Sequence, residues 1–142
     1  MSFSCYAFWI VLDMTKDLNL NKSADVKLTA EKILAKVPYS NGFHFFTSVG
    51  QYTGETAVSL ETFAREVEVI SIESVVFHFK RADFQKWIAD AVGDTELAIA
   101  IGNIEKELTG EVLRRRILEI INARVIELES KILYGSTKGS KK

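Results

Sequence analysis

Apolar residues recur along most of this chain at the spacing of α-helices. The first such stripe follows a polar stretch at residues 15–25. Its members would share one helix face: Val26, Ala30, Ile33, Leu34 and Val37. Asp25 is placed as an N-cap, and Pro38 ends the helix because proline disfavours the helical conformation of the residue before it. We therefore predict a helix from Val26 to Val37.

A strand-like alternation comes next. Its two alternating sets are Phe43, Phe45 and Val49, and His44, Phe46 and Ser48. Residues 50–54 (GQYTG) are typical of a loop, and residues 55–59 can return as a second strand. The pattern predicts an antiparallel β-hairpin over about residues 43–59.

Two helices are predicted after the hairpin. Ser59 is the N-cap of the first. The apolar stripe of that helix is Leu60, Phe63, Ala64 and Val67. Residues 72–80 are compatible with a helix, through Ile72, Val75, Val76 and Phe79, and with a strand, through Val75, Phe77 and Phe79. We favour the helix, although the β-branched residues also suit a strand.

Two aspartates mark the starts of the next helices. Asp83 and Asp94 are placed as N-caps, and Gly93 ends the helix between them. The inward residues of the first of these helices are Phe84, Trp87, Ile88 and Ala91. Those of the second are Leu97, Ile101, Ile104 and Leu108.

The longest helix is predicted from Glu111 to Tyr134, with Gly135 ending it. It carries an apolar seam at alternating steps of three and four residues: Leu118, Ile121, Val125, Leu128 and Ile132. A second apolar row covers only its first half: Leu113, Ile117 and Ile120. A seam of this spacing is typical of coiled coils, so it predicts a two-fold homodimer or a protein partner. The alternative is a monomer in which the N-terminal segment or the first helix folds back over the seam.

Together these elements predict an α+β fold that is mostly α, with about six helices, a small hairpin and a long C-terminal helix at about residues 111–134. We expect an N-terminal segment and linker (residues 1–25), one α-rich domain (26–134) and a basic flexible tail (135–142). Residues 5–12 are apolar on both alternating sets. This is typical of a strand covered on both faces, or of an upstream stretch that is not native, with the true start at Met14.

Length and composition agree with a single globular domain. The chain has 142 residues, of which 47% are hydrophobic and 26% charged, with a net charge of −1. The apolar run at residues 5–12 is too short to span a membrane, so no membrane association is expected. Cys5 is the only cysteine and cannot form an internal disulfide, which favours a reducing cytoplasm.

Charge is distributed unevenly along the chain. Residues 111–142 carry eight Lys or Arg against four Asp or Glu. The candidate contacts for nucleic acid in this region are Arg114, Arg115, Arg116, Lys138, Lys141 and Lys142. Three consecutive arginines point in different directions around a helix, so we expect at most weak binding without sequence preference.

No catalytic or metal-binding motif is present, and we expect no enzyme activity, no metal and no cofactor. The densest chemical cluster lies at residues 78–88. Its candidates for a small-ligand or anion site are His78, Arg81, Asp83 and Trp87. The structural alternative, which we favour, is a fixed corner. In it Asp83 caps a helix, Arg81 pairs locally, Trp87 fills the core and His78 bonds a backbone carbonyl.

Several segments resemble an uncharacterised archaeal and bacterial family, a domain of unknown function. They are Phe43–Phe46, residues 50–54, residues 59–63, Phe77–Ile88 and residues 93–98. The most specific is the motif Phe-His-Phe-x-Arg-x-Asp-Phe-x-x-Trp-Ile within Phe77–Ile88. The resemblance covers roughly residues 28–130. It implies a small domain that stands alone or is appended to other proteins, and it brings no catalytic residues.

The leading functional hypothesis is a non-catalytic interaction or regulatory module of a cytoplasmic prokaryotic protein, acting through its long C-terminal helix. The alternatives are weak nucleic-acid binding through the basic C-terminal region, or a ligand or anion site around His78, Arg81 and Asp83. A deep pocket lined by these three side chains would favour the ligand site.

Overall fold

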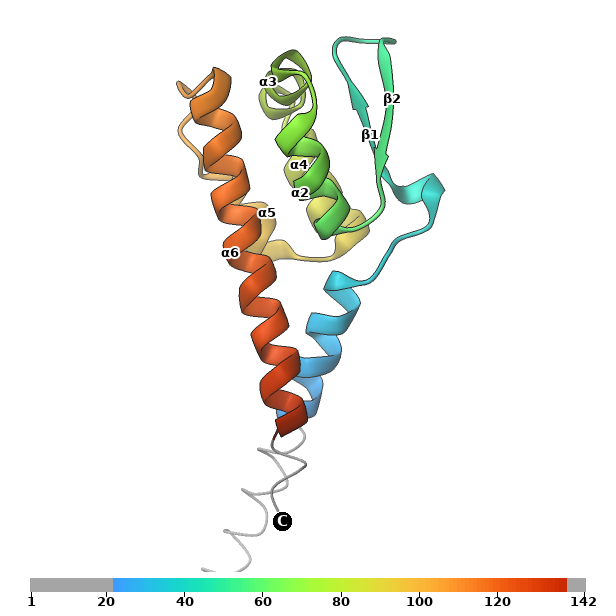
Figure 1. The fold of residues 1–142 in the computed structure, drawn as a ribbon, viewed down its shortest axis with the longest axis vertical. Coiled ribbons are helices and arrows are strands. Elements are labelled where there is room, and N and C mark those ends of the chain that lie inside the picture. Colours follow the sequence, from blue (N-terminus) through green and yellow to red (C-terminus); the bar gives the residue numbers. More distant parts are fainter. Residues whose placement is uncertain (1–21, 138–142) are drawn as a thin grey trace, which may run out of the picture.

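A computed structural model describes residues 22–137 as six α-helices and one two-stranded sheet (Figure 1). The first helix spans residues 22–34. The other elements are η1 (Tyr39–Asn41), β1 (Phe43–Phe46), β2 (Tyr52–Ala57), α2 (Leu60–Val69), α3 (Ile72–Lys80), α4 (Asp83–Trp87), the π-helical turn η2 (Ile88–Val92), α5 (Thr95–Gly102) and α6 (Gly110–Thr137). The predicted class, mostly α with a small antiparallel hairpin and a long C-terminal helix, is confirmed.

The second strand of the hairpin begins earlier than the sequence predicted. β1 and β2 are antiparallel with the register Phe43↔Ala57, His44↔Thr56 and Phe46↔Tyr52. β2 bulges between the last two pairs, where the Thr53 hydroxyl donates to the Phe45 carbonyl at 2.8 Å and Gly54 takes a positive φ of 92°. The expectation that residues 52–54 belong to the loop is therefore wrong, because this side-chain bridge lets β2 begin at Tyr52.

The alternation along β1 sets the core. Phe43 and Phe45 point inward and are buried, whereas His44 and Phe46 are only half-buried. The inward rings join an aromatic cluster with Phe63 of α2, Phe84 and Trp87, in which the Phe63 and Trp87 rings stack at 5.2 Å. This cluster fixes the hairpin against α2 and α4.

Local signals located most of the middle helices correctly. Ser59 caps α2 in a capping box with Thr62, whose backbone N–H donates to the serine hydroxyl at 3.1 Å. α3 spans Ile72–Lys80, which confirms the choice of a helix there. Gly93 ends η2 at a φ of 85°. Asp94 caps α5 by accepting from the Leu97 N–H at 3.1 Å.

Three predicted boundaries of the first helix and α5 are wrong. The first helix begins by residue 22 and ends at residue 34, so Asp25 lies inside it and accepts at its carbonyl from the Thr29 hydroxyl. Val37 lies beyond that helix, because its N–H donates to the Val58 carbonyl at 2.7 Å, just after β2. α5 ends at Gly102, and Ile104 reaches the core from an irregular segment.

α6 is the longest element and crosses most of the molecule (Figure 1). It packs against α2, α3 and α5 through buried side chains in its first half, Leu113, Ile117 and Ile121. It continues past Gly135 to Thr137, since a single glycine costs a helix only about 1 kcal/mol. The first helix lies beside its second half, as the shared cavity lined by Val26, Ala30 and Leu128 shows.

Some expectations fall outside residues 22–137. These are the paired or non-native segment at residues 5–12, the start at Met14 and the tail beyond residue 137. Within the described range, none of the helices combines the length and the apolarity needed to cross a membrane.

Candidate functional site

An open cavity of about 360 Å³ lies between the hairpin and the C-terminal end of α3. We call it the hairpin groove. The residues that line it include Phe43, His44, Phe46, Val49, Phe77, His78, Arg81 and Asp83. β1 lies against α3, so it forms one wall, and α3 with the turn after it forms the other (Figure 1).

His78 links the two walls of the groove. Its Nε2 accepts a hydrogen bond from the backbone N–H of Phe46 at 2.8 Å, and its Nδ1 lies 2.8 Å from Oδ2 of Asp83. Because the backbone N–H can only donate, Nε2 must carry the lone pair and Nδ1 the proton. The ring is therefore neutral, and burial lowers its pKa further below the ordinary value.

The hydrogen-bond partner of His78 differs from the prediction. The sequence suggested a backbone carbonyl, which would have required the ring to donate. Instead Nε2 of the ring accepts a hydrogen bond from the Phe46 N–H, on the edge of β1 that lies opposite β2. This bond joins residues that are 32 positions apart, so no local pattern indicated it.

Asp83 is the first residue of α4 and does not cap it. The residue before it, Ala82, has the left-handed φ of 61°, and no side-chain hydrogen bond caps the helix. The Asp83 carboxylate instead accepts from His78 and pairs with Nε of Arg81 at 3.2 Å. The prediction of an N-cap at Asp83 is therefore wrong, because the carboxylate turns back toward α3.

Arg81 provides the exposed cation of the groove. Its side chain is 53% exposed, and its guanidinium carbon lies 5.0 Å from the centre of the Phe77 ring. The pair with Asp83 and the stack on Phe77 hold the guanidinium from two sides. The predicted partner Trp87 does not line the groove. It is buried in the aromatic cluster, and its Nε1–H donates to the Asn41 carbonyl at 2.8 Å.

The outer face of the hairpin carries a polar aromatic group that sequence reasoning did not single out. Thr56 Oγ1 lies 2.7 Å from His44 Nδ1 and 2.6 Å from the Tyr52 hydroxyl, and Tyr39 packs edge-on against His44. Tyr39 and Tyr52 are exposed. The alternation along β1 was the available signal, because it places His44 on the face opposite Phe43 and Phe45.

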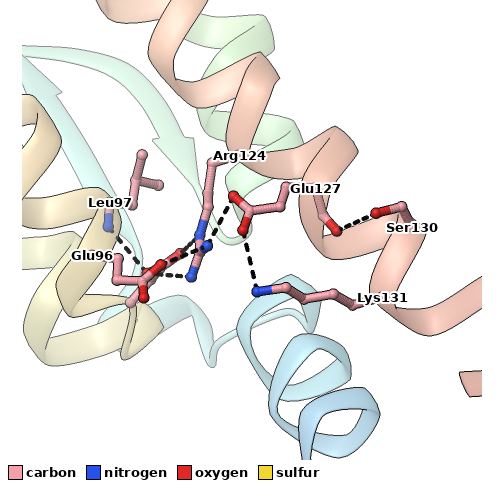
Figure 2. Close-up of polar contacts among 7 residues, drawn as sticks. Glu96, Leu97, Arg124, Glu127, Ser130 and Lys131 are labelled. Carbon is pink, nitrogen blue, oxygen red and sulfur yellow. Dashed lines mark hydrogen bonds and ion pairs between the residues drawn. The ribbon is translucent and has the colours of Figure 1, made fainter. Parts of the chain in front are cut away.

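A second charged cluster joins α5 to α6 (Figure 2). Arg124 makes a bidentate pair with Asp94, with Nε to Oδ2 at 2.7 Å and Nη2 to Oδ1 at 3.0 Å. Its Nη1 also lies near Glu96 and Glu127, at 2.9 and 3.1 Å. Hydrogen bonding to Asp94 raises the pKa of Arg124, and the hydrogen bond from Arg124, together with one from Lys131, lowers the pKa of Glu127.

The Arg124 cluster lines the cavity between the first helix and α6, but its charges are engaged with one another. Its Asp94 side chain is 1% exposed and already accepts from the Leu97 N–H as an N-cap. Arg124 itself is 11% exposed and fully paired. Its arrangement can clamp two helices together, because each guanidinium nitrogen of Arg124 already faces a carboxylate.

The predicted interface seam on α6 lies largely inside the molecule. Ile121 and Leu128 are buried, and Leu118, Val125 and Ile132 are partly buried against the core. The first helix contributes Ala30 and Ile33 to the same core near Leu128. Ile121 and Leu128 are therefore not available to a partner, whereas Ile126 on another face of α6 is 66% exposed.

Within residues 22–137, the three predicted nucleic-acid contacts do not form one surface. Nη1 of Arg114 donates to the carbonyls of Val67 and Ile70 at 2.7 and 2.6 Å, which binds α6 to the C-terminal end of α2. Arg115 is exposed, and Arg116 is exposed and pairs with Glu119 at 3.5 Å. Lys138, Lys141 and Lys142 lie outside the described residues. In residues 22–137 no group of three or more His, Cys, Asp or Glu is arranged to hold a metal ion.

The chain belongs to a family of unknown function, DUF5752, whose family model matches residues 18–122. The match starts earlier and ends earlier than the range of about 28–130 that the resemblance indicated. No curated protein and no solved structure matches the chain. The hairpin groove lies wholly within the matched residues, whereas the second half of α6 lies beyond them.

Proposed function

We propose that this protein is a non-catalytic binding module whose binding surface is the hairpin groove. The sequence favoured α6 as the interaction surface. The groove is the better candidate because it is open to solvent, while the centre of the α6 seam is covered within the chain.

The hydrogen bonding of both ring nitrogens of His78 is the observation that supports a non-catalytic role. General acid or base catalysis needs a ring nitrogen that can exchange a proton with a substrate. Here Nε2 is occupied by the Phe46 N–H and Nδ1 by Asp83. The imidazole at the groove is thus a structural link between β1 and α3, and the Asp83 carboxylate is engaged by the same link.

The lining of the groove supports binding. Pockets for small molecules are mostly apolar with a few placed polar groups, and their volumes start at about 300 Å³. This groove combines phenylalanine side chains with one exposed guanidinium. Val49 projects from the hairpin turn at its rim and is 81% exposed, which leaves apolar surface for a bound molecule to cover.

A regulatory role in a prokaryotic cytoplasm remains part of this proposal. The single cysteine of the sequence is consistent with a reducing compartment. Ile126 is exposed on α6, so the surface around it is the competing candidate for the binding surface.

The test compares retention of native binding partners and ligands by three forms of the full chain. Val49→Glu places a charge at the rim of the groove, and Ile126→Glu places the same charge on α6. We expect material co-purified from the native cells to be lost with Val49→Glu and kept with both Ile126→Glu and the wild type. Equal melting temperatures exclude unfolding as the cause, since both positions are exposed. Loss with Ile126→Glu and retention with Val49→Glu would show that α6 is the binding surface instead.

A further inference from the structure

We infer that the hairpin groove binds a small apolar carboxylic acid, with its carboxylate on Arg81 and its apolar body against Phe46, Val49 and Phe77. The inference rests on the proposed function and adds the chemical class of the ligand.

The guanidinium of Arg81 is arranged for a carboxylate. Its pairing with Asp83 uses Nε, at 3.2 Å, and no hydrogen bond within residues 22–137 engages its two terminal nitrogens. The guanidinium carbon lies over the Phe77 ring, 5.0 Å from its centre, and this contact limits its movement. A planar fork held in this way matches the two oxygens of a carboxylate.

The local charge favours one negative charge over two. Arg81 carries one positive charge and Asp83 one negative charge, and His78 is neutral because Nε2 accepts from the Phe46 N–H. A doubly charged phosphate would face the Asp83 carboxylate with a single cation to balance it. A carboxylate adds half that charge to a pair that is already balanced, and one guanidinium can hold both of its oxygens.

The size and the strand edge favour a small ligand over an extended peptide. Peptides that add to a sheet edge need its backbone N–H and carbonyl groups. At β1 the Phe46 N–H is already bonded to His78 across the groove, so a further strand cannot pair there. The remaining space, about 360 Å³, suits a molecule with one aromatic or aliphatic body.

The experiment is a titration of the ¹⁵N-labelled full chain with 3-phenylpropionate, followed by NMR. The matched probes are 3-phenylpropionamide, which lacks the charge, acetate, which lacks the apolar body, and inorganic phosphate. We expect saturable shifts at the amides of Phe46, Val49, Phe77 and Arg81 at roughly millimolar ligand. The amide, acetate and phosphate should each bind about tenfold more weakly or not measurably.

Two arginine variants locate the charge. Arg81→Gln should weaken 3-phenylpropionate about tenfold, and Arg81→Lys should restore part of the affinity because it keeps the charge without the fork. Arg116→Gln removes a similarly exposed arginine outside the groove and should change nothing. An unchanged melting temperature for Arg81→Gln assigns its effect to binding.

The inference is overturned if 3-phenylpropionate does not bind, if its amide or phosphate binds as tightly, if the shifts lie on α6, or if Arg81→Gln has no effect. The proposed function fails separately. If 3-phenylpropionate does not bind but Val49→Glu still abolishes retention of native partners, the groove is a binding surface for another class of ligand. If 3-phenylpropionate binds as expected but retention is insensitive to Val49→Glu, the groove takes a carboxylate and the native partners bind elsewhere.

Discussion

Two aspartates begin neighbouring helices in this protein, and their surroundings differ. Asp94 is buried, caps α5 and is saturated by the bidentate pair with Arg124. Asp83 does not cap α4, holds His78 instead, and leaves its arginine partner half-exposed at the rim of an open groove. Asp94 precedes its helix as the N-cap, whereas Asp83 is the first residue of its helix. The same residue type near a helix start thus serves helix packing in one place and the wall of a candidate binding site in the other.

Removal of Asp94 is the strongest test of this contrast. In Asp94→Ala the Leu97 N–H loses its acceptor and Arg124 loses its main partner in a site that is 11% exposed. We expect the free energy of unfolding to fall by about 3–5 kcal/mol, measured by urea denaturation. Asp94→Asn keeps the cap and should cost clearly less. A loss below about 1 kcal/mol for Asp94→Ala would mean that the clamp contributes little to stability.

Removal of His78 should have the next largest effect. His78→Ala leaves the Phe46 N–H without its acceptor and frees the Asp83 carboxylate from one donor. We expect a loss of about 2–3 kcal/mol in the free energy of unfolding. The control is His44→Ala on the outer face of the same strand, which loses one part-buried hydrogen bond to Thr56 and for which we expect about 1 kcal/mol or less. Equal losses for the two histidines would contradict the linking role of His78.

The pH dependence of stability sharpens the comparison further. Burial holds the pKa of His78 below 6.5 in the folded protein, so the unfolded chain takes up this proton first as the pH falls. The contribution of neutral His78 is therefore fully present above pH 6.5 and is lost as the pH drops through the folded pKa. The difference in unfolding free energy between the wild type and His78→Ala should narrow below pH 6.5. A difference that widens toward acid pH would mean that the folded state holds His78 protonated.

Replacing each of the two arginines by glutamine compares the open pair with the closed cluster. Arg81→Gln should have the smallest effect of all the variants on the free energy of unfolding. Arg81→Gln removes one member of an exposed pair, and we expect a change in unfolding free energy of about 0.5 kcal/mol or less. Arg124→Gln leaves the buried Asp94 without its charged partner and should cost several times more. Denaturation curves of the two variants side by side provide the measurement. Similar losses would remove the distinction between an open and a closed cluster.

The sequence located elements whose signals are local. The helix ends are marked by residues that act within three or four positions of themselves: Ser59, Gly93 and Asp94. The apolar stripes of α2 and α3 recur at helical spacing between polar residues, as expected for a helix that packs on a core. The class of the fold follows from these elements. Boundaries were less accurate where a neighbouring element competed, as at Val37, whose N–H bonds Val58.

The candidate site was predicted in part. The cluster at residues 78–88 was identified, and three of its four candidate residues do line the groove. Their roles depended on distant partners: His78 on Phe46, Trp87 on Asn41, and in the same way Arg114 on Val67. Asp83 resembled a cap because composition and spacing cannot reveal that Ala82 takes a left-handed conformation. Contacts over 30 or more residues need the assembled fold.

The most direct test of a structural rather than catalytic His78 is its tautomer and charge, measured by ¹⁵N NMR of the ring in the full chain. We expect the Nδ1–H tautomer at pH 7, with an unprotonated Nε2 that shows a hydrogen-bond coupling to the Phe46 amide. An Nε2–H tautomer, or a ring that is already charged at pH 7, would contradict this arrangement. Either result would return His78 to the groups that can exchange protons with a bound molecule.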